Sequence, residues 1–217
     1  MSVPDAPVVS DVSAPARRYW LVFIVRALVA GVVALVITFS ADHSALLGFR
    51  VFGGFAIAGG IVACVSSWIA LERGVARSFL LAQGVVSVVL GIVAVVTSGA
   101  SVPYFLFLLG AWAVFTGVLE LYVGIRSRRL RVVQARDWVF AGALTLLLAL
   151  GVLLVPASYS QHFTGPDGVA RDLTASVVVV GLFGAYTAIL AVYLVIAGLS
   201  LKWGTQRAPL PTAEGSN

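Results

Sequence analysis

Six long hydrophobic stretches, separated by short polar segments, dominate the pattern of the chain. They cover approximately residues 20–40, 49–70, 78–98, 104–125, 138–156 and 174–201. Each is close to the roughly 20 residues that a helix needs to cross a hydrocarbon core of about 30 Å. A bilayer offers the backbone no hydrogen-bonding partners, and the stretches lack the polar/apolar alternation of a membrane barrel. The pattern therefore predicts an all-α, polytopic membrane bundle of six helices.

Composition agrees with this prediction. The 217 residues are 60% hydrophobic and only 11% charged, with a mean hydropathy of +1.05. A soluble domain has about 25% charged residues, so this chain has too few polar side chains to cover a water-exposed surface. The net charge of +5 does not indicate nucleic-acid binding, because the arginines stand in short clusters between hydrophobic stretches. The expected surroundings are a lipid bilayer.

The positive charges predict an orientation. Eleven of the 14 Lys and Arg residues fall on one side of the predicted membrane: Arg17, Arg18, Arg73, Arg77, Arg126, Arg128, Arg129, Arg131, Arg136, Lys202 and Arg207. Only Arg50 and Arg171 fall on the other side, and Arg26 lies within the first stretch. Trp20, Trp68, Trp138 and Trp203 stand at the same helix ends as the basic clusters. Both signals place the N- and C-termini in the cytoplasm.

The two ends of the chain are expected to lie outside the membrane domain. Residues 1–18 contain three prolines with serine and aspartate between them, which is typical of a disordered tail. Residues 204–217 are predicted to form a second disordered cytoplasmic tail. The six-helix domain then covers residues 19–203. The first stretch lacks a clear cleavage site and is expected to be retained rather than removed as a signal peptide.

An internal threefold repeat divides this domain into helical hairpins, at about residues 19–74, 75–133 and 134–203. Arg26-Ala-Leu-Val-Ala aligns with Gln83-Gly-Val-Val-Ser and Ala141-Gly-Ala-Leu-Thr, and Gly53-Gly-Phe aligns with Gly110-Ala-Trp and Gly184-Ala-Tyr. Each hairpin starts on the same side, so the repeats are parallel. The third hairpin carries about 16 extra residues in its outer loop, near 157–172.

Small residues recur on the second helix of each hairpin at steps of three and four, which places them on one helix face. The glycines of these stripes are Gly53, Gly60, Gly110, Gly117, Gly124, Gly184 and Gly198. Small residues let helix backbones approach closely in membranes. The stripes predict helix packing within the chain, with homodimerisation as the alternative.

The segments GVVSVVLGIVAVV (84–96) and GAWAVFTGVLELYVGI (110–125) resemble the short membrane repeat of the HdeD-like acid-resistance proteins. The resemblance covers essentially residues 19–203. It implies a six-helix protein of the bacterial inner (plasma) membrane with a role in acid tolerance. Arg26 and Glu120 match charged positions of that repeat, whereas Ala27 stands where a glycine is usual.

Two charged residues lie well inside the predicted helices. Arg26 and Glu120 are each about six residues from the cytoplasmic helix end, roughly 9 Å deep, and Gln83 is the repeat equivalent of Arg26. An unpaired charge at this depth costs a few kcal/mol. We expect Arg26, Gln83 and Glu120 to form an intramembrane polar layer. The alternative is that Arg26 extends to the interface while Glu120 is protonated.

Other polar residues give weaker hypotheses. His43 and His162 in the outer loops are candidates for sensing external pH, because histidine titrates near pH 6.5. The basic segment with Arg126, Arg128, Arg129 and Arg131 is a candidate contact for anionic lipid, although topology alone accounts for it equally well.

Catalytic and metal-binding patterns do not occur in the sequence. HExxH, GxSxG and P-loop motifs are missing, and one cysteine (Cys64) with two histidines is too few for a zinc cage. We therefore expect no catalytic residues, no metal and no cofactor. The favoured interpretation is a non-enzymatic membrane protein of acid or envelope stress tolerance, or a structural subunit, with itself or another membrane protein as partner. The alternative is a small transporter or channel subunit.

Overall fold

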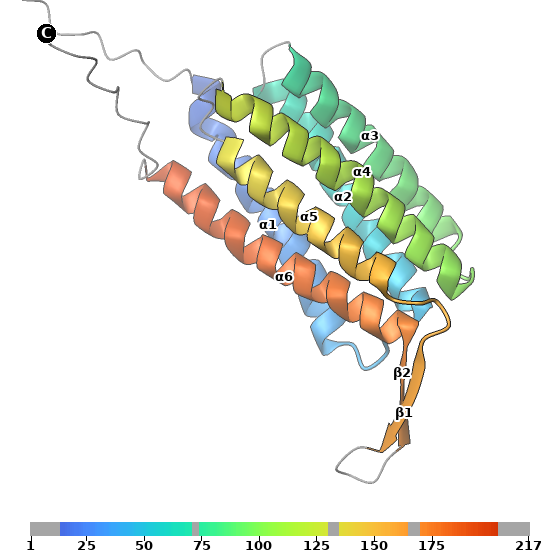
Figure 1. The fold of residues 1–217 in the computed structure, drawn as a ribbon. Helices are drawn as coiled ribbons and strands as arrows, with labels where there is room; N and C mark the ends of the chain where they lie inside the picture. Colours follow the sequence, from blue (N-terminus) through green and yellow to red (C-terminus); the bar gives the residue numbers. More distant parts are fainter. Residues whose placement is uncertain (1–13, 71–73, 130–134, 165–169, 204–217) are drawn as a thin grey trace, which may run out of the picture.

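The computed structural model describes residues 14–70, 74–129, 135–164 and 170–203. In this part the chain forms six helices and one short hairpin of strands: α1 (Ala14–Phe39), α2 (Ala45–Ala70), α3 (Val75–Val96), α4 (Val102–Arg129), α5 (Ala135–Leu154), β1 (Ser160–Thr164), β2 (Ala170–Thr174) and α6 (Ala175–Lys202). The helices run side by side as one up-and-down bundle (Figure 1). The fold class predicted from the sequence is confirmed.

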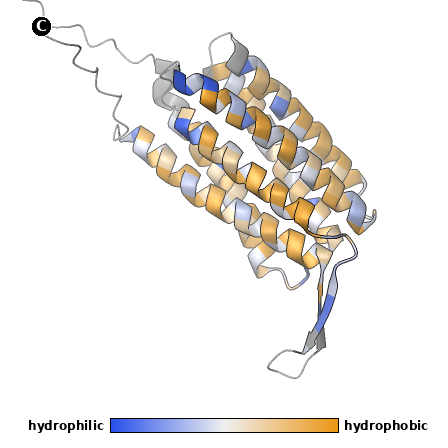
Figure 2. Cartoon of the chain, in the orientation of Figure 1, coloured by the Kyte–Doolittle hydropathy of each residue, from blue (hydrophilic) through white to orange (hydrophobic). Residues whose placement is uncertain are grey.

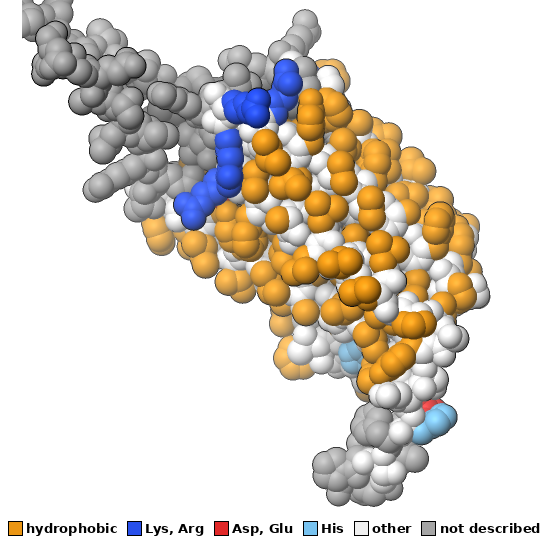
Figure 3. All heavy atoms as spheres, viewed as in Figure 1, with side chains coloured by type: hydrophobic (Ala, Val, Ile, Leu, Met, Phe, Trp, Pro, Cys, Tyr) orange, Lys and Arg blue, Asp and Glu red, His pale blue; other side chains and the backbone are white. Residues whose placement is uncertain are grey.

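The helices are hydrophobic along most of their length (Figure 2), and hydrophobic side chains cover most of the face of the bundle seen in Figure 3. Large side chains such as Leu28, Phe107 and Leu153 are exposed on its outside, and each of the six helices is long and apolar enough to cross a membrane. A soluble protein does not expose a continuous apolar belt of this extent. The six helices thus indicate a multi-pass membrane protein.

The two ends of the bundle differ in charge (Figure 3). At one end, here called the basic end, α1 begins, α6 ends, and α4 closes with Arg126, Arg128 and Arg129 in its last turn. The opposite end, here called the hairpin end, carries β1 and β2. At the basic end the guanidinium of Arg77 lies 4.4 Å from the ring centroid of Trp68, which is exposed. Of the four tryptophans expected at an interface, Trp138 differs, because it is buried in the core between helices.

The six helices form a closed ring in chain order, with alternating tight and loose interfaces. The closest pairs are α2 with α3, α4 with α5, and α6 with α1, whereas the two helices of each sequence repeat contact each other less extensively. The helical hairpin is therefore the repeating unit of the sequence, but the closest helix packing joins each helical hairpin to the next one. The α6–α1 contact closes the ring.

Glycines make these tight interfaces possible. A Cβ atom on Gly60 would stand 2.6 Å from the Gly84 carbonyl oxygen, and one on Gly142 would stand 2.9 Å from the Gly117 carbonyl oxygen. A Cβ atom added to Gly117, Gly124, Gly184 or Gly198 would likewise stand 3.0 Å or less from a side chain of α5 or α1. One added to Gly53 would be equally close to α3. Gly110 differs, since its nearest neighbour, Val152, is at an ordinary 3.7 Å. All seven predicted packing glycines thus face a neighbouring helix of the same chain, and at six of them an added Cβ would be closer than an ordinary van der Waals contact.

The α6–α1 interface solves the same packing problem with a different residue. At the position equivalent to Gly60 and Gly117, α6 carries Ala191, whose Cβ faces Gly31 of α1. The equivalents of Gly31 in the other repeats are Val88 and Leu146, which are large. At this interface the glycine lies on α1 instead of α6. The two backbones therefore still approach each other, although Ala27 of α1 stands where the other repeats have a glycine.

Two features differ from the sequence-based boundaries. α1 begins at Ala14, inside the predicted tail, because Pro15 is tolerated in a first helical turn where its missing N–H is not needed. The third outer loop contains an antiparallel β-hairpin that pairs Ser160 with Thr174 and His162 with Asp172. Residues 1–13 and 204–217 of the predicted tails, and Arg131, lie outside the described residues.

Candidate functional site

The structure brings together the three residues of the predicted polar layer. Glu120 Oε1 accepts a hydrogen bond from Arg26 Nη2 at 2.8 Å and another from Gln83 Nε2 at 3.1 Å. The side chain of Glu120 is 4% exposed, and that of Arg26 is 21% exposed. The ion pair joins α1 to α4, and Gln83 extends it to α3, so the layer links the first hairpin to the second.

An aromatic cluster lies next to the polar layer, toward the hairpin end. Phe55, Trp112 and Tyr186 occupy equivalent positions of the three repeats, on α2, α4 and α6. Their ring centroids are 5.7 Å apart for Phe55–Trp112, 6.2 Å for Phe55–Tyr186 and 6.5 Å for Trp112–Tyr186. All three are buried. We call these rings the aromatic trio, and they meet where the three second helices converge.

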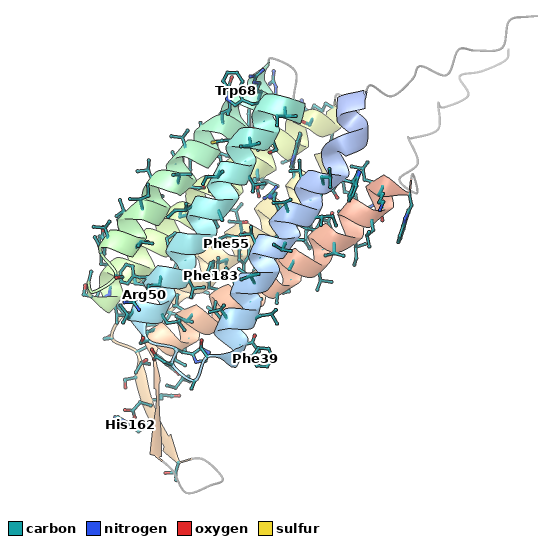
Figure 4. All side chains as sticks on the ribbon, turned by 180° about the vertical axis from the view of Figure 1, so that it is seen from behind. Phe39, Arg50, Phe55, Trp68, His162 and Phe183 are labelled. Atoms are coloured by element: carbon teal, nitrogen blue, oxygen red, sulfur yellow. The ribbon has the colours of Figure 1, made fainter. Side chains whose placement is uncertain are left out.

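Further aromatic rings pack against the aromatic trio. Phe183 lies 5.5 Å from Phe55 and 6.0 Å from Phe52, centroid to centroid. Figure 4 shows Phe55 and Phe183 side by side inside the bundle, between the labelled residues of the two ends. The centre of the ring is thus filled by aromatic side chains at this level.

Trp112 and Tyr186, the two members of the aromatic trio whose side chains have a polar atom, each form a hydrogen bond. Trp112 Nε1 donates to Ser87 Oγ at 3.0 Å. Tyr186 and Thr145 hydroxyls are 3.0 Å apart, and because Thr145 donates to the Ala141 carbonyl, the Tyr186 O–H is the donor. Ser87 and Thr145 are repeat equivalents, and the corresponding residue of the first helical hairpin, which contributes Phe55 to the trio, is Ala30. The polar groups of the trio are thereby satisfied without water.

The pairing predicts a specific pattern of stability changes. Ser87→Ala should lower the free energy of unfolding by about 1–2 kcal/mol, because it leaves the buried Trp112 N–H without an acceptor. In a Trp112→Phe background the same change should be nearly neutral, since it recreates the Phe55–Ala30 pair of the first hairpin. Unfolding titrations of the four variants measure this coupling. Equal losses in both backgrounds would show that the hydrogen bond contributes nothing.

A small cavity of about 50 Å³ separates the aromatic trio from the polar layer. Side chains of all six helices line it, including Arg26, Gln83 and Glu120 on one side and Trp112, Thr145 and Tyr186 on the other. Gln83, 7% exposed, lines the cavity, and its Oε1 has no hydrogen-bond partner among the described residues. The cavity therefore places charged, amide and hydroxyl groups inside the bundle, among a lining that is otherwise apolar.

A second polar pair, between the buried Asp137 and the partly buried Tyr193, lies near the basic end and was not predicted. Tyr193 OH donates to Asp137 Oδ1 at 2.8 Å, and the Tyr193 ring stacks on Phe140 at 3.8 Å. Asp137 is buried and lies in the first turn of α5, where the helix dipole favours a negative charge. This hydrogen bond links α6 to α5. Its position at a helix start, outside the middle of the hydrophobic stretch, made it inconspicuous in the sequence.

The two predicted external histidines lie at the hairpin end. His162 Nδ1 contacts Asp172 Oδ1 across the strand pair, and both side chains are exposed. His43 lies between α1 and α2, beside Asp42. The side-chain and backbone N–H hydrogen bonds from Ser44 lower the pKa of Asp42, and His43 adds a smaller effect of the same sign. The structure does not bring the histidines to the polar layer.

The Asp42 contact predicts a pH response of this loop. Because its pKa is lowered by folding, the contribution of Asp42 is complete above the ordinary carboxyl pKa and is lost as pH falls through the lower, folded value. Ser44→Ala should return the pKa of Asp42 toward its ordinary value. An NMR titration of the Asp42 carboxyl carbon measures the change, with Ser40→Ala as a control that leaves the contact intact. An unchanged titration curve would contradict the assignment.

The remaining predicted residues fall on the surface. Arg126, Arg128 and Arg129 are exposed at the end of α4, and a shallow groove beside Arg126 and Arg129 is lined by Tyr122 and Ile125. Within the described ranges, no three His, Cys, Asp or Glu side chains gather as metal ligands.

Comparison with known proteins gives one match. Residues 82–155 match the family described as a short repeat of unknown function (DUF308). The matched segment includes most of α3, all of α4 and α5, and therefore Gln83, Trp112 and Glu120. Searches of the curated proteins and of the solved structures found no match.

Proposed function

We propose that this chain is a non-enzymatic protein of the bacterial inner membrane that acts in acid or envelope stress tolerance, as an HdeD-like protein or a structural subunit of a membrane complex. The observation that carries this proposal is the filled centre of the ring. Rings of Phe55, Trp112 and Tyr186 meet on the bundle axis at centroid distances of 5.7 to 6.5 Å, which leaves no room there for a solute. Such a bundle is suited to packing and to partner binding rather than to transport.

The orientation is part of the same proposal. The basic end carries Arg77, Arg126, Arg128 and Arg129, and the positive-inside rule assigns such an end to the cytoplasm. Both described ends of the chain, α1 and α6, then face the cytoplasm, and the β-hairpin faces outward. Exposed arginines at the end of α4 are suitably placed for anionic headgroups of the inner leaflet. A reporter fused within residues 165–169 should be detected outside the cytoplasm.

Flux through vesicles tests the absence of transport. Purified protein in lipid vesicles with an internal pH dye should leak protons no faster than empty vesicles. A small transporter or channel subunit is the alternative, and the charged pair beside the cavity is the observation in its favour. Proton or ion flux that disappears in Glu120→Gln would establish the alternative and overturn the proposal.

A separate experiment addresses the stress role. Deletion of the gene in the bacterium that carries it should reduce survival after an acid challenge, and the wild-type gene should restore it. Equal survival of both strains across acid and envelope stresses would contradict this part of the proposal, whatever the flux measurement shows.

A further inference from the structure

We infer that the cavity between the polar layer and the aromatic trio is a water-binding site in the middle of the membrane, entered sideways between α1 and α2. The occupants are one or two water molecules that donate to Gln83 Oε1 and solvate the Arg26–Glu120 pair. This inference does not depend on the stress role proposed above.

The first argument is the unsatisfied amide of Gln83. Its Nε2 donates to Glu120 Oε1 at 3.1 Å, which fixes the orientation of the amide and leaves Oε1 as the free acceptor of a residue that lines the cavity. Oε1 is buried and has no partner among the described residues. A buried carbonyl without a hydrogen bond costs about 1–3 kcal/mol. A donor small enough to reach it removes this penalty.

The second argument is size and polarity. A cavity of about 50 Å³ exceeds the volume of one water, which occupies about 30 Å³ in the liquid, but it is far smaller than an apolar cavity that accepts benzene. Water also needs two to four polar partners. Gln83, Glu120 and Arg26 provide them on one side, and the hydroxyls of Thr116 and Tyr186 lie on the lining as well.

The third argument gives the route of entry. The lining residues contributed by α3, α4, α5 and α6 are all buried, whereas Arg26, Val29, Gly59 and Ala63 are partly exposed. These four lie on α1 and α2. A Cβ atom on Gly59 would meet nothing within 4 Å, so this glycine leaves the wall of the cavity open. The cavity therefore opens between α1 and α2 and ends at the aromatic trio.

The depth of the site makes the inference testable. Gly59 is 11 residues before the end of α2, which places it roughly 16 Å from the basic end and near the centre of the hydrocarbon core. Water has no reason to be ordered at this depth unless polar groups hold it. Radiolysis of water by synchrotron X-rays labels a buried side chain only where water lies beside it, so it reports the occupant directly.

The experiment is hydroxyl-radical labelling of the full chain in lipid nanodiscs, read by mass spectrometry. We expect Phe55, on the cavity wall and 7% exposed, to be oxidised at least several-fold faster than Phe105, which is also buried (0% exposed) but does not line the cavity. Trp112 should be oxidised as well, with exposed Trp68 as the positive control. If Phe55 reacts as slowly as Phe105 while Trp68 reacts, the cavity is dry or filled by lipid and the inference is overturned.

Two glycine positions of α2 have room for a larger side chain, and substitutions there distinguish entry of water through the cavity opening from an effect at the outer surface. Gly59→Leu should fill the opening and lower the labelling of Phe55 to that of Phe105. Gly54→Leu is the matched control, because Gly54 lies on the same helix, is exposed, and also has nothing within 4 Å of an added Cβ. Labelling of Phe55 should stay unchanged in that variant. An equal effect of both leucines would show that the label enters by general loosening of the bundle and would overturn the route.

Discussion

Glu120→Ala is expected to lower the free energy of unfolding by about 3 kcal/mol, the largest loss from a single polar substitution in this chain. Removing one partner of a buried ion pair costs about 3–5 kcal/mol, because the remaining charge stays buried without compensation. The lower end applies here, since Arg26 is 21% exposed and its long side chain can extend toward the basic end. Gln83 loses its acceptor in the same variant.

A double-mutant cycle tests the pair itself. Arg26→Ala with Glu120→Ala should cost about 1–3 kcal/mol less than the sum of the two single changes, because no charge is left unpaired. Glu120→Gln, which keeps the shape and an acceptor for Arg26, is the conservative control and should lose less than Glu120→Ala. Reversible unfolding in mixed micelles provides the free energies. Additive losses would mean that Arg26 is solvated at the interface and that the contact is incidental.

Gly142→Ala is expected to destabilise the bundle by about 3 kcal/mol, although it adds a single methyl group. The added Cβ would stand 2.5 Å from Leu121 N, 2.9 Å from Gly117 O and 3.0 Å from Leu121 Cα. All three are backbone atoms of α4, so no rotamer change relieves the contact and the two helices must separate. Loss of the close approach removes packing along the whole α4–α5 interface.

The matched control for this change is Gly181→Ala on α6. Gly181 is exposed and an added Cβ there would meet nothing within 4 Å. Alanine is favoured over glycine in a helix by about 0.5–1 kcal/mol, so this variant should be unchanged or slightly more stable. The same unfolding titration compares both. If the two alanines have the same effect, backbone approach does not determine the stability of this interface.

Hydrophobic length and repeat symmetry carry much of the fold information in this sequence. The six stretches predicted helices whose ends agree with the structure within a few residues, because a bilayer leaves the backbone no other choice. The extent of α1 and the β-hairpin were missed. The extra residues near 157–172 were recognised as a long outer loop, but strands of mixed polar residues such as Ser160–Thr164 carry no strong strand signal.

The candidate site was predicted in part, for a physical reason. Charged residues deep in a hydrophobic stretch need partners, and this requirement pointed to Arg26 and Glu120, whereas the repeat alignment added Gln83. The aligned triplets ending in Phe55, Trp112 and Tyr186 already contained the aromatic trio, but aromatic residues are too common in membrane helices to be distinctive. The glycines that receive the packing stripes, Gly84, Gly91 and Gly142, lie on the first helices and became meaningful only when the tight pairs proved to be α2–α3 and α4–α5.

The closed ring has a consequence for biosynthesis. The chain is made from the N-terminus, so α1 enters the membrane before the other five described helices, yet its closest neighbour, α6, is made after them. Throughout synthesis the face of α1 that contains Gly31 has no partner, and Arg26 stays without Glu120 until α4 arrives. A nascent chain that stops before α6 therefore presents an open seam to the membrane's proteases and insertion factors, and only the full-length chain can close it.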